Sequence, residues 1–253
     1  HARRCVMATV EIVDRSEMIR KMKDLLEINP KETAIVTVDM HRGHLDPAVA
    51  TMPASDQDCE RVIRATERLL GEARAAGVHV IHVVTVQRLI PGLGAEGRAC
   101  PFWAKLIQMV ETDRWVPGKK SVLDQHNIEG SILTQIISSL YEREKDYVID
   151  NKKRLNCFTN TDLEHLLRIL GVKTVVLTGI NTNTCVLNTA FSAMDRDFAV
   201  VVISDCVASM YGDDLHVFAL QNIARCIGWV LTVDEFVEKL KAGVAGELVA
   251  ATV

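Results

Sequence analysis

Short runs of β-branched and other apolar residues alternate along this chain with longer stretches whose apolar residues recur at helical spacing. Six runs are of the first kind, at residues 33–39, 78–86, 146–150, 174–179, 198–204 and 229–232. Apolar runs of this length separated by helices are typical of parallel strands joined by crossover helices, with helices on both faces of the sheet. The pattern predicts an α/β protein with a three-layer, Rossmann-like fold and a six-stranded, mainly parallel sheet.

The helical stretches between these runs are best defined at residues 58–77, 161–171 and 213–228, and each ends in glycine, which is favoured just beyond a helix C-terminus. No repeat, proline-rich linker or charge block divides the chain. We therefore expect a single domain over residues 1–253, with an N-terminal extension at 1–30. The least periodic segment, 87–130, is expected to be an insertion over the active-site face.

Charge and cysteine content exclude several classes of protein. The 29 basic and 33 acidic residues give a net charge of −4, so no basic field is available to hold nucleic acid. No apolar run approaches the roughly 18 residues of a membrane span. The seven cysteines are odd in number and form no C-x-x-C pair, which favours free thiols in a reducing compartment and hence a cytoplasmic location.

Polar residues lie where three of the predicted strands end. Asp39 ends the first strand, Lys152 follows the third, and Cys185 comes just after the fourth, near the start of a helix. Ligands of open α/β sheets bind at these carboxyl ends. A helix N-terminus and a nearby ammonium favour a thiolate, and a neighbouring carboxylate can accept the thiol proton. Each residue alone also has a structural explanation: a buried apolar cysteine, a strand-end cap and a solvated lysine.

The motifs around these residues resemble those of the isochorismatase-like cysteine hydrolases, which include nicotinamidases, N-carbamoylsarcosine amidases and ureide hydrolases. That family carries a strand-ending D-x-Q-x-x-F, a later K-x-x-x-S-x-F and then G-[IV]-x-T-x-x-C. Here TAIVTVDMHRGHLDP supplies Asp39, and GINTNTC supplies Cys185. Lys152 precedes Phe158 by the family's spacing, so it is preferred over Lys153. The resemblance runs in order over most of the chain and is weakest between 87 and 145.

The resemblance implies a mechanism as well as a fold. It implies a cis peptide between Ile180 and Asn181, and an oxyanion hole formed by the backbone N–H groups of Asn181 and Cys185. Asp39 would deprotonate Cys185, the thiolate would attack an amide carbonyl, and water would hydrolyse the resulting thioester after ammonia leaves. Lys152 would supply positive charge throughout, and no cofactor is expected.

Two residues beside the aspartate depart from the family pattern. His41 stands where the family has glutamine, and His44 stands where it has phenylalanine. A more polar pocket follows, and we expect both histidines to bind substrate together with Arg88, Phe158 and Asn181.

Asp39-x-His41-x-x-His44 can also be interpreted as a set of metal ligands. Nicotinamidases bind their metal through an acidic and histidine cluster after the second strand, and here that region reads VVTVQRLIPG. Because histidine and aspartate are shared by many sites without metal, we expect none. The sequence suggests no partner for His126, His165 or His216.

The predicted insertion contains a glycine motif and several large side chains. Residues 92–97 fit G-x-G-x-x-G, but they do not follow a strand directly or open a helix, so a flexible loop is expected rather than a dinucleotide site. Trp103 and Trp115, with Phe102 and Arg88, are expected to wall the pocket or to pack against a second subunit. The resemblance implies a homodimer or homotetramer.

The C-terminal stretch ALQNIARCIGWV, residues 219–230, resembles ureide amidohydrolases more than nicotinamidases. It favours a small ureide or carbamoyl substrate, such as biuret, triuret, an N-carbamoyl amino acid or a ureidoacrylate. A simple amidase of nicotinamide or maleamate is the alternative within the class. Outside catalysis, the chain could be a binding member of the fold or a thiol-redox protein, with Cys206 as the nearby resolving cysteine.

Overall fold

A six-stranded sheet forms the centre of the protein. The structure is a computed structural model that describes residues 12–110 and 123–250. The strands are β1 (Thr33–Val38), β2 (His79–Thr85), β5 (Tyr147–Lys152), β6 (Thr174–Ile180), β7 (Ala199–Ala208) and β8 (Trp229–Leu231). Their order is β5-β2-β1-β6-β7-β8, and every adjacent pair is parallel. All six predicted strands are confirmed, and the expected α/β fold with them.

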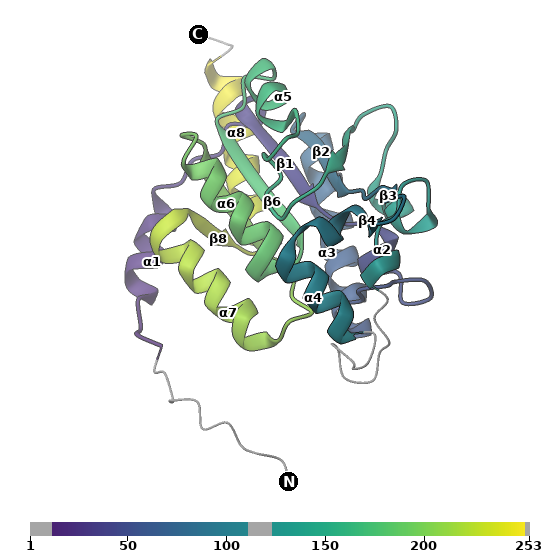
Figure 1. The fold of residues 1–253 in the computed structure, drawn as a ribbon. Helices are drawn as coiled ribbons and strands as arrows, with labels where there is room; N and C mark the ends of the chain where they lie inside the picture. The colour runs from purple at the N-terminus through teal and green to yellow at the C-terminus, as the bar shows by residue number, and fades with distance from the viewer. Residues whose placement is uncertain (1–11, 111–122, 251–253) are drawn as a thin grey trace.

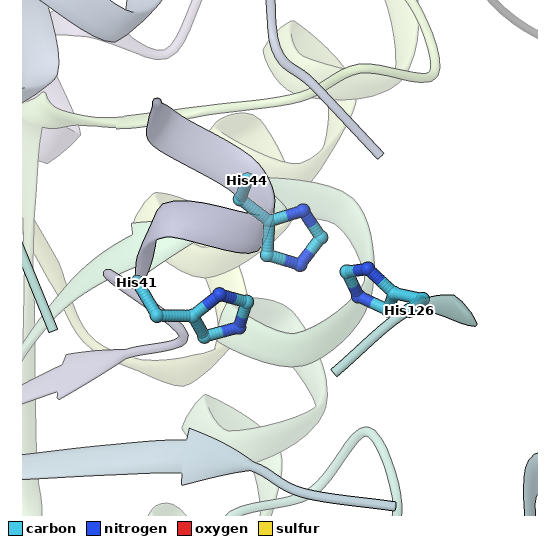
Figure 2. Close-up of side chains that lie close together, drawn as sticks. All are labelled: His41, His44 and His126. Carbon is cyan, nitrogen blue, oxygen red and sulfur yellow. The ribbon is translucent and has the colours of Figure 1, made fainter. Parts of the chain in front are cut away.

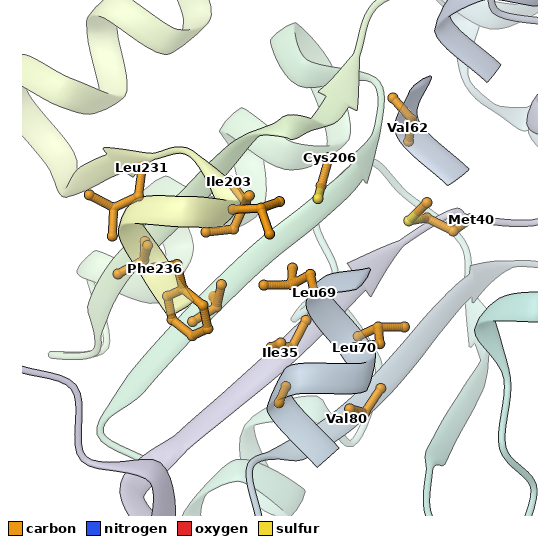
Figure 3. Close-up of a cluster of buried hydrophobic side chains, with 14 of the residues drawn as sticks. Ile35, Met40, Val62, Leu69, Leu70, Val80, Ile203, Cys206, Leu231 and Phe236 are labelled. Carbon is orange, nitrogen blue, oxygen red and sulfur yellow. The ribbon is translucent and has the colours of Figure 1, made fainter. Parts of the chain in front are cut away.

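Helices cover both faces of this sheet because its central strands are apolar on both sides (Figure 1). On one face Ile35 of β1 packs with α3 (Asp56–Ala75) and α8 (Val233–Ala250), as Figure 3 shows for Leu69, Leu70 and Phe236. On the other face Val36 packs with α5 (Leu163–Ile169), α6 (Leu187–Met194) and the segment after α7 (Asp213–Asn222). Successive side chains of one strand therefore belong to different cores.

The predicted insertion contains structure of its own. It includes the antiparallel pair β3 (Leu89–Ile90) and β4 (Gly94–Ala95) and the helix α4 (Pro101–Val110). The glycine motif at 92–97 thus spans the hairpin turn, its second strand and the start of the 3-10 turn Glu96–Ala99, whereas the sequence suggested a flexible loop. Gly92 and Gly94 have φ angles of 78° and 85°, the left-handed region that glycine adopts without strain.

Short elements complete the description. The remaining α-helices are α1 (Ser16–Asp24), in the predicted N-terminal extension, and α2 (Arg42–Leu45). Single 3-10 turns occur at Pro30–Glu32, Glu96–Ala99, Leu123–Gln125, Ile132–Thr134 and Ser138–Leu140, and π-helical turns occur at Thr182–Val186 and Ile223–Ile227. Within the described residues, no helix has both the length and the apolar character that a membrane span requires.

A buried ionic network attaches the edge strand β5 to the rest of the sheet. The Asp146 carboxylate, just before β5, accepts hydrogen bonds from Arg74 Nε and Nη2 of α3 at 3.0 and 2.6 Å. It also lies 3.2 Å from His82 Nε2, and His82 Nδ1 is 2.7 Å from Thr37 Oγ1. Burial opposes ionisation of Asp146, but the bonds from His82 and Arg74 outweigh it and lower its pKa to about 2.

We expect Asp146→Asn to lower the free energy of unfolding by about 3 kcal/mol, because it removes the fully buried one of the two carboxylates that pair with the Arg74 guanidinium. The other carboxylate, that of Glu142, is 45% exposed and lies 3.1 Å from Arg74 Nη1. A carboxylate whose pKa is lower in the folded state stabilises the fold above its unfolded pKa of about 3.9. That contribution is lost as the pH falls toward about 2. Denaturant unfolding at neutral pH and at about pH 2 measures this difference. Asp150→Asn, at an exposed site on the same strand, is the control and should change stability by less than about 0.5 kcal/mol.

Candidate active site

The strand order creates a crevice between β1 and β6. From β1 the chain continues outward to β2, whereas β6 begins the series that continues outward to β7 and β8 on the other side. Such a reversal separates the connections above the carboxyl ends of the two central strands and leaves room for a ligand. Asp39 directly follows β1, and Cys185 follows β6 within the π-helical turn Thr182–Val186. Two of the three predicted residues therefore flank the crevice.

Gly179 allows β6 to approach β1 closely at this point. A Cβ atom on residue 179 would lie 1.9 Å from the carbonyl oxygen of Val38, and its φ angle of 112° is one that residues with side chains rarely adopt. The peptide bond between Ile180 and Asn181, at the end of β6, is cis, as expected. The π-helical turn Thr182–Val186 then carries Cys185 to the start of α6. This local backbone determines the position of the thiol.

Lys152, the third predicted residue, contacts both Asp39 and Cys185. Its ammonium Nζ lies 2.5 Å from Asp39 Oδ2, 3.6 Å from Cys185 Sγ and 2.6 Å from Thr85 Oγ1. Asp39 Oδ1 accepts a hydrogen bond from the Thr85 backbone N–H at 2.8 Å. The neighbouring Lys153 instead donates to the Val86 carbonyl oxygen, at 2.5 Å. The structure thus brings together Asp39, Lys152 and Cys185, with Lys152 rather than Lys153 beside the thiol.

The charges within this group are strongly coupled. Burial opposes ionisation of Asp39, yet Lys152 and the nearby histidines lower its pKa to about 2. Burial likewise opposes the Lys152 ammonium, but Asp39 and Cys185 raise its pKa above the usual value. For Cys185, burial outweighs the attraction of Lys152 and raises the thiol pKa to about 11. The resting site therefore contains a carboxylate, an ammonium and a neutral thiol, whereas the sequence suggested a thiolate.

A cavity of about 380 Å³ opens above these three residues. Its wall also includes His44 and Asn181, both expected to contact substrate. His41, Arg88 and Phe158 were also expected to contact substrate, but none of them lines the cavity. The His41 side chain is fully buried, the largely exposed Arg88 pairs with Glu96, and the Phe158 ring stacks on Phe198 in the core.

Several lining residues come from segments to which the sequence assigns no single role. Trp103, from α4, lines the cavity, as do His126, Asn188 and Tyr211. Trp103 therefore walls the pocket, one of the two roles considered for it, while Phe102 is 69% exposed. Trp115 lies outside the described residues. Helical spacing and loop composition give no signal for these roles, because the contacts form between segments that are distant in sequence.

His126 has partners that the sequence did not reveal. Its ring centroid lies 4.8 Å from that of His44 and 5.9 Å from that of His41, and the His41 and His44 rings are 4.9 Å apart (Figure 2). Burial lowers the pKa of all three imidazoles, and that of His41 to about 3, so they are neutral near pH 7. Among the described residues, this trio is the one group of at least three histidine, cysteine or acidic side chains with spacing suited to a metal ion.

A thiol beside a carboxylate and an ammonium, at the crevice of a parallel α/β sheet, is the arrangement expected of a cysteine hydrolase. The isochorismatase domain matches residues 33–235 of the chain. The chain belongs to the isochorismatase family.

Individual relatives agree with this assignment. The chain is similar to ureidoacrylate amidohydrolase RutB of Serratia proteamaculans, at 27% identity over 92% of this chain and 98% of the relative. It is 31% identical to the protein of that name from Methylorubrum extorquens, over 81% of each chain. A cysteine hydrolase from Pseudomonas syringae pv. phaseolicola 1448A superposes with a TM-score of 0.71 at 25% identity, over 86% of this chain and 96% of that one.

Proposed function

We propose that this chain is a cysteine amidohydrolase that cleaves a C–N bond of a small ureide or carbamoyl compound and releases ammonia. The observation that carries the proposal is the buried Lys152 ammonium, which contacts both the Asp39 carboxylate and the Cys185 sulfur at the floor of the cavity. A nucleophile, a proton acceptor and a fixed positive charge are thereby adjacent in a site partly shielded from water. The ureidoacrylate amidohydrolases to which the chain is similar support the substrate class.

In the proposed reaction Cys185 transfers its proton to Asp39 as its sulfur attacks the substrate carbonyl. The new C–S bond gives a tetrahedral intermediate, whose oxyanion is held by the backbone N–H groups of Asn181 and Cys185. Each such donor contributes on the order of 3 kcal/mol. Collapse breaks the C–N bond, and Asp39 returns the proton to the departing nitrogen. Water then cleaves the thioester and restores the thiol.

The raised pKa of the Cys185 thiol is compatible with this step because the three groups titrate together. Asp39 is one of the groups that raise it, through its negative charge and a hydrogen bond to the thiol. Moving the proton from sulfur to Asp39 removes that charge and leaves the thiolate facing Lys152. Pairing of thiolate and ammonium then replaces pairing of carboxylate and ammonium, so the buried site never holds an unpaired charge.

The cavity wall is consistent with a flat polar substrate. Trp103 and Tyr211 provide aromatic surfaces, while Asn188 contributes an amide group to the wall. Lys153 and Arg154 bring positive charge to the same cavity. A ureido group is planar and rich in N–H and C=O groups, and ureidoacrylate and N-carbamoyl amino acids also carry a carboxylate. We infer that Arg154 pairs with this carboxylate.

Ammonia release from a panel of small molecules tests the proposed function. Biuret, triuret, an N-carbamoyl amino acid and ureidoacrylate represent ureides, and nicotinamide and maleamate represent simple amides. We expect turnover of at least one ureide at a higher kcat/KM than either simple amide. Preference for a simple amide would contradict the ureide assignment, and no turnover of any compound would favour a binding role.

Arg154→Ala should lower kcat/KM about tenfold for the ureides that carry a carboxylate, mainly through KM, because a charge-assisted hydrogen bond from an exposed group is lost. Biuret has no carboxylate and should be affected much less. Arg143→Ala, at another exposed site, is the control for general surface charge. An equal loss for both kinds of ureide would assign Arg154 a different role.

The thiol-redox alternative has less support from the cysteine positions. Cys206 packs in the core that faces α3 and α8, whereas Cys185 belongs to the core on the other face of the sheet (Figure 3). Cys185 and Cys206 are both free thiols. This supports a reducing compartment, and we infer the cytoplasm. The homodimer or homotetramer stays a prediction.

A further inference from the structure

We propose that His41, His44 and His126 bind one divalent transition-metal ion, with zinc the best match, beside the cavity. Each histidine offers one ring nitrogen, and these three nitrogens lie within 4.8 Å of one another. His41 and His44 come from the turn after β1 and from α2, and His126 follows the 3-10 turn Leu123–Gln125. Figure 2 shows the three rings grouped around a common space.

The spacing of the rings is close to that of three imidazoles on one ion. With zinc–nitrogen bonds of about 2.1 Å in a tetrahedron, ligand nitrogens lie roughly 3.4 Å apart. The nitrogens here are within 4.8 Å, and the ring centroids of neighbouring pairs are 4.8 to 5.9 Å apart. Small rotations of the side chains therefore suffice to close the set around an ion.

Hydrogen bonds on the far side of two rings fix their orientation as metal sites require. His44 Nδ1 lies 2.8 Å from the Met52 carbonyl oxygen, which can only accept, so Nδ1 carries the proton and Nε2 keeps its lone pair. His126 Nδ1 is held by Thr51 Oγ1 at 2.8 Å. Met52 and Thr51 are adjacent, so one short segment orients both rings.

Asn127 and Gly43 hold the third ring. Asn127 Nδ2 lies 2.9 Å from His41 Nε2, and Asn127 Oδ1 is buried without a hydrogen-bond partner among the described residues. Rotating the amide exchanges the two atoms, so Asn127 can present either an oxygen or an N–H to His41 and select its tautomer. A Cβ on residue 43 would lie 2.4 Å from Asn127 Oδ1 and 3.0 Å from the His41 ring. Glycine is therefore needed for this packing.

Buried neutral imidazoles suit a borderline cation, and the Asp39 carboxylate, 3.9 Å from His41 Nε2, is already paired with Lys152. Exposure is 0% for His41, 4% for His44 and 5% for His126, and a hard cation such as Mg²⁺ or Ca²⁺ would prefer oxygen ligands. Nitrogen ligands favour zinc and the neighbouring transition metals. Three protein ligands leave a fourth position, as in zinc sites that bind water or substrate.

That fourth position lies toward the cavity, because His44 and His126 line its wall and His41 does not. An ion held by the three histidines would bind an oxygen or nitrogen atom of the substrate at this fourth position, while the substrate carbonyl lies at Cys185. This substrate role rests on the proposed function, whereas metal binding itself does not.

Metal binding is measured on the whole chain. The chain is first treated with a chelator, the chelator is removed, and Zn²⁺ or Co²⁺ is then added before dialysis. We expect about one Zn²⁺ or Co²⁺ per chain after dialysis, and intense visible absorption from four-coordinate Co²⁺. His126→Ala and His126→Asn should each weaken the affinity at least 100-fold. Zinc at about 100 times its Kd should raise the Tm of the unmodified chain by roughly 5 °C and leave that of His126→Ala unchanged. The exposed His165→Ala should bind as the unmodified chain does.

Cys185→Ala separates this proposal from the proposed function. It should keep the metal and lose turnover. Loss of the metal in Cys185→Ala would place the ion on the thiol and overturn the histidine site. The histidine site would also be overturned if the unmodified chain retained no metal after dialysis, or if the His126 variants held as much metal as the unmodified chain. Full turnover without any metal binding would overturn the metal site and leave the amidohydrolase proposal in place.

Discussion

Replacing Cys185 with alanine is expected to reduce ureide turnover by a factor on the order of 10⁴ or more, because losing a nucleophile removes the covalent route entirely. Cys185 is 7% exposed and small, so removing its sulfur should cost only about 1 kcal/mol of stability. Ammonia release gives kcat and KM, and thermal unfolding of the same preparation verifies the fold.

Cys100→Ala is the matched control for this variant. Cys100 also lines the cavity, so the two variants each remove one thiol from the same wall. Cys100 lacks the contact with Lys152 that Cys185 has at 3.6 Å, and we expect at most a severalfold change in turnover. Retention of turnover by Cys185→Ala, or an equal loss in both variants, would contradict the assignment of the nucleophile.

Asp39→Asn should lower both turnover and stability. It removes the proposed proton acceptor, which is expected to reduce kcat by about 10³-fold. It also leaves the Lys152 ammonium, 1% exposed, without its counter-ion, which should cost about 3 to 5 kcal/mol of unfolding free energy. Asp46→Asn is the control: Asp46 pairs with Arg42 in a partly exposed position, and its loss should cost less than about 1 kcal/mol.

The double variant Asp39→Asn with Lys152→Met separates the two effects. Removing both buried charges should recover at least about 1 kcal/mol of the stability lost by Asp39→Asn, because no unpaired ion remains. Turnover should stay as low as in the single variant. If the stability loss of the double variant equals the sum of the losses in Asp39→Asn and Lys152→Met alone, Asp39 and Lys152 do not stabilise one another. If turnover returns, the chemistry uses neither charge.

The sheet and its crossover helices were predictable because their signals are local. Continuous apolar runs and period-3.6 patterns are properties of neighbouring residues, and all six strands appear where the apolar runs placed them. Asp39 and Cys185 could be expected to meet for a related reason, since parallel strands bring their carboxyl ends to one edge of a sheet. The cis peptide at Ile180–Asn181 could be expected only from the family resemblance.

The ionisation of the site and the histidine trio were decided by the tertiary structure. Whether the Cys185 thiol is charged depends on the balance between its burial and the positive charge of Lys152. The extent of burial cannot be predicted from the sequence. In the structure burial raises the pKa of Cys185, whereas the sequence suggested a lowered pKa. His41 and His44 lie close together in sequence, whereas His126 belongs to the predicted insertion, whose sequence has no periodic pattern, and only the folded chain brings its ring 4.8 Å from that of His44. The sequence therefore determined the sheet and the order of the motifs along it, because these depend on local periodicity. Packing between distant segments decided the charge of the thiol and the partners of His126.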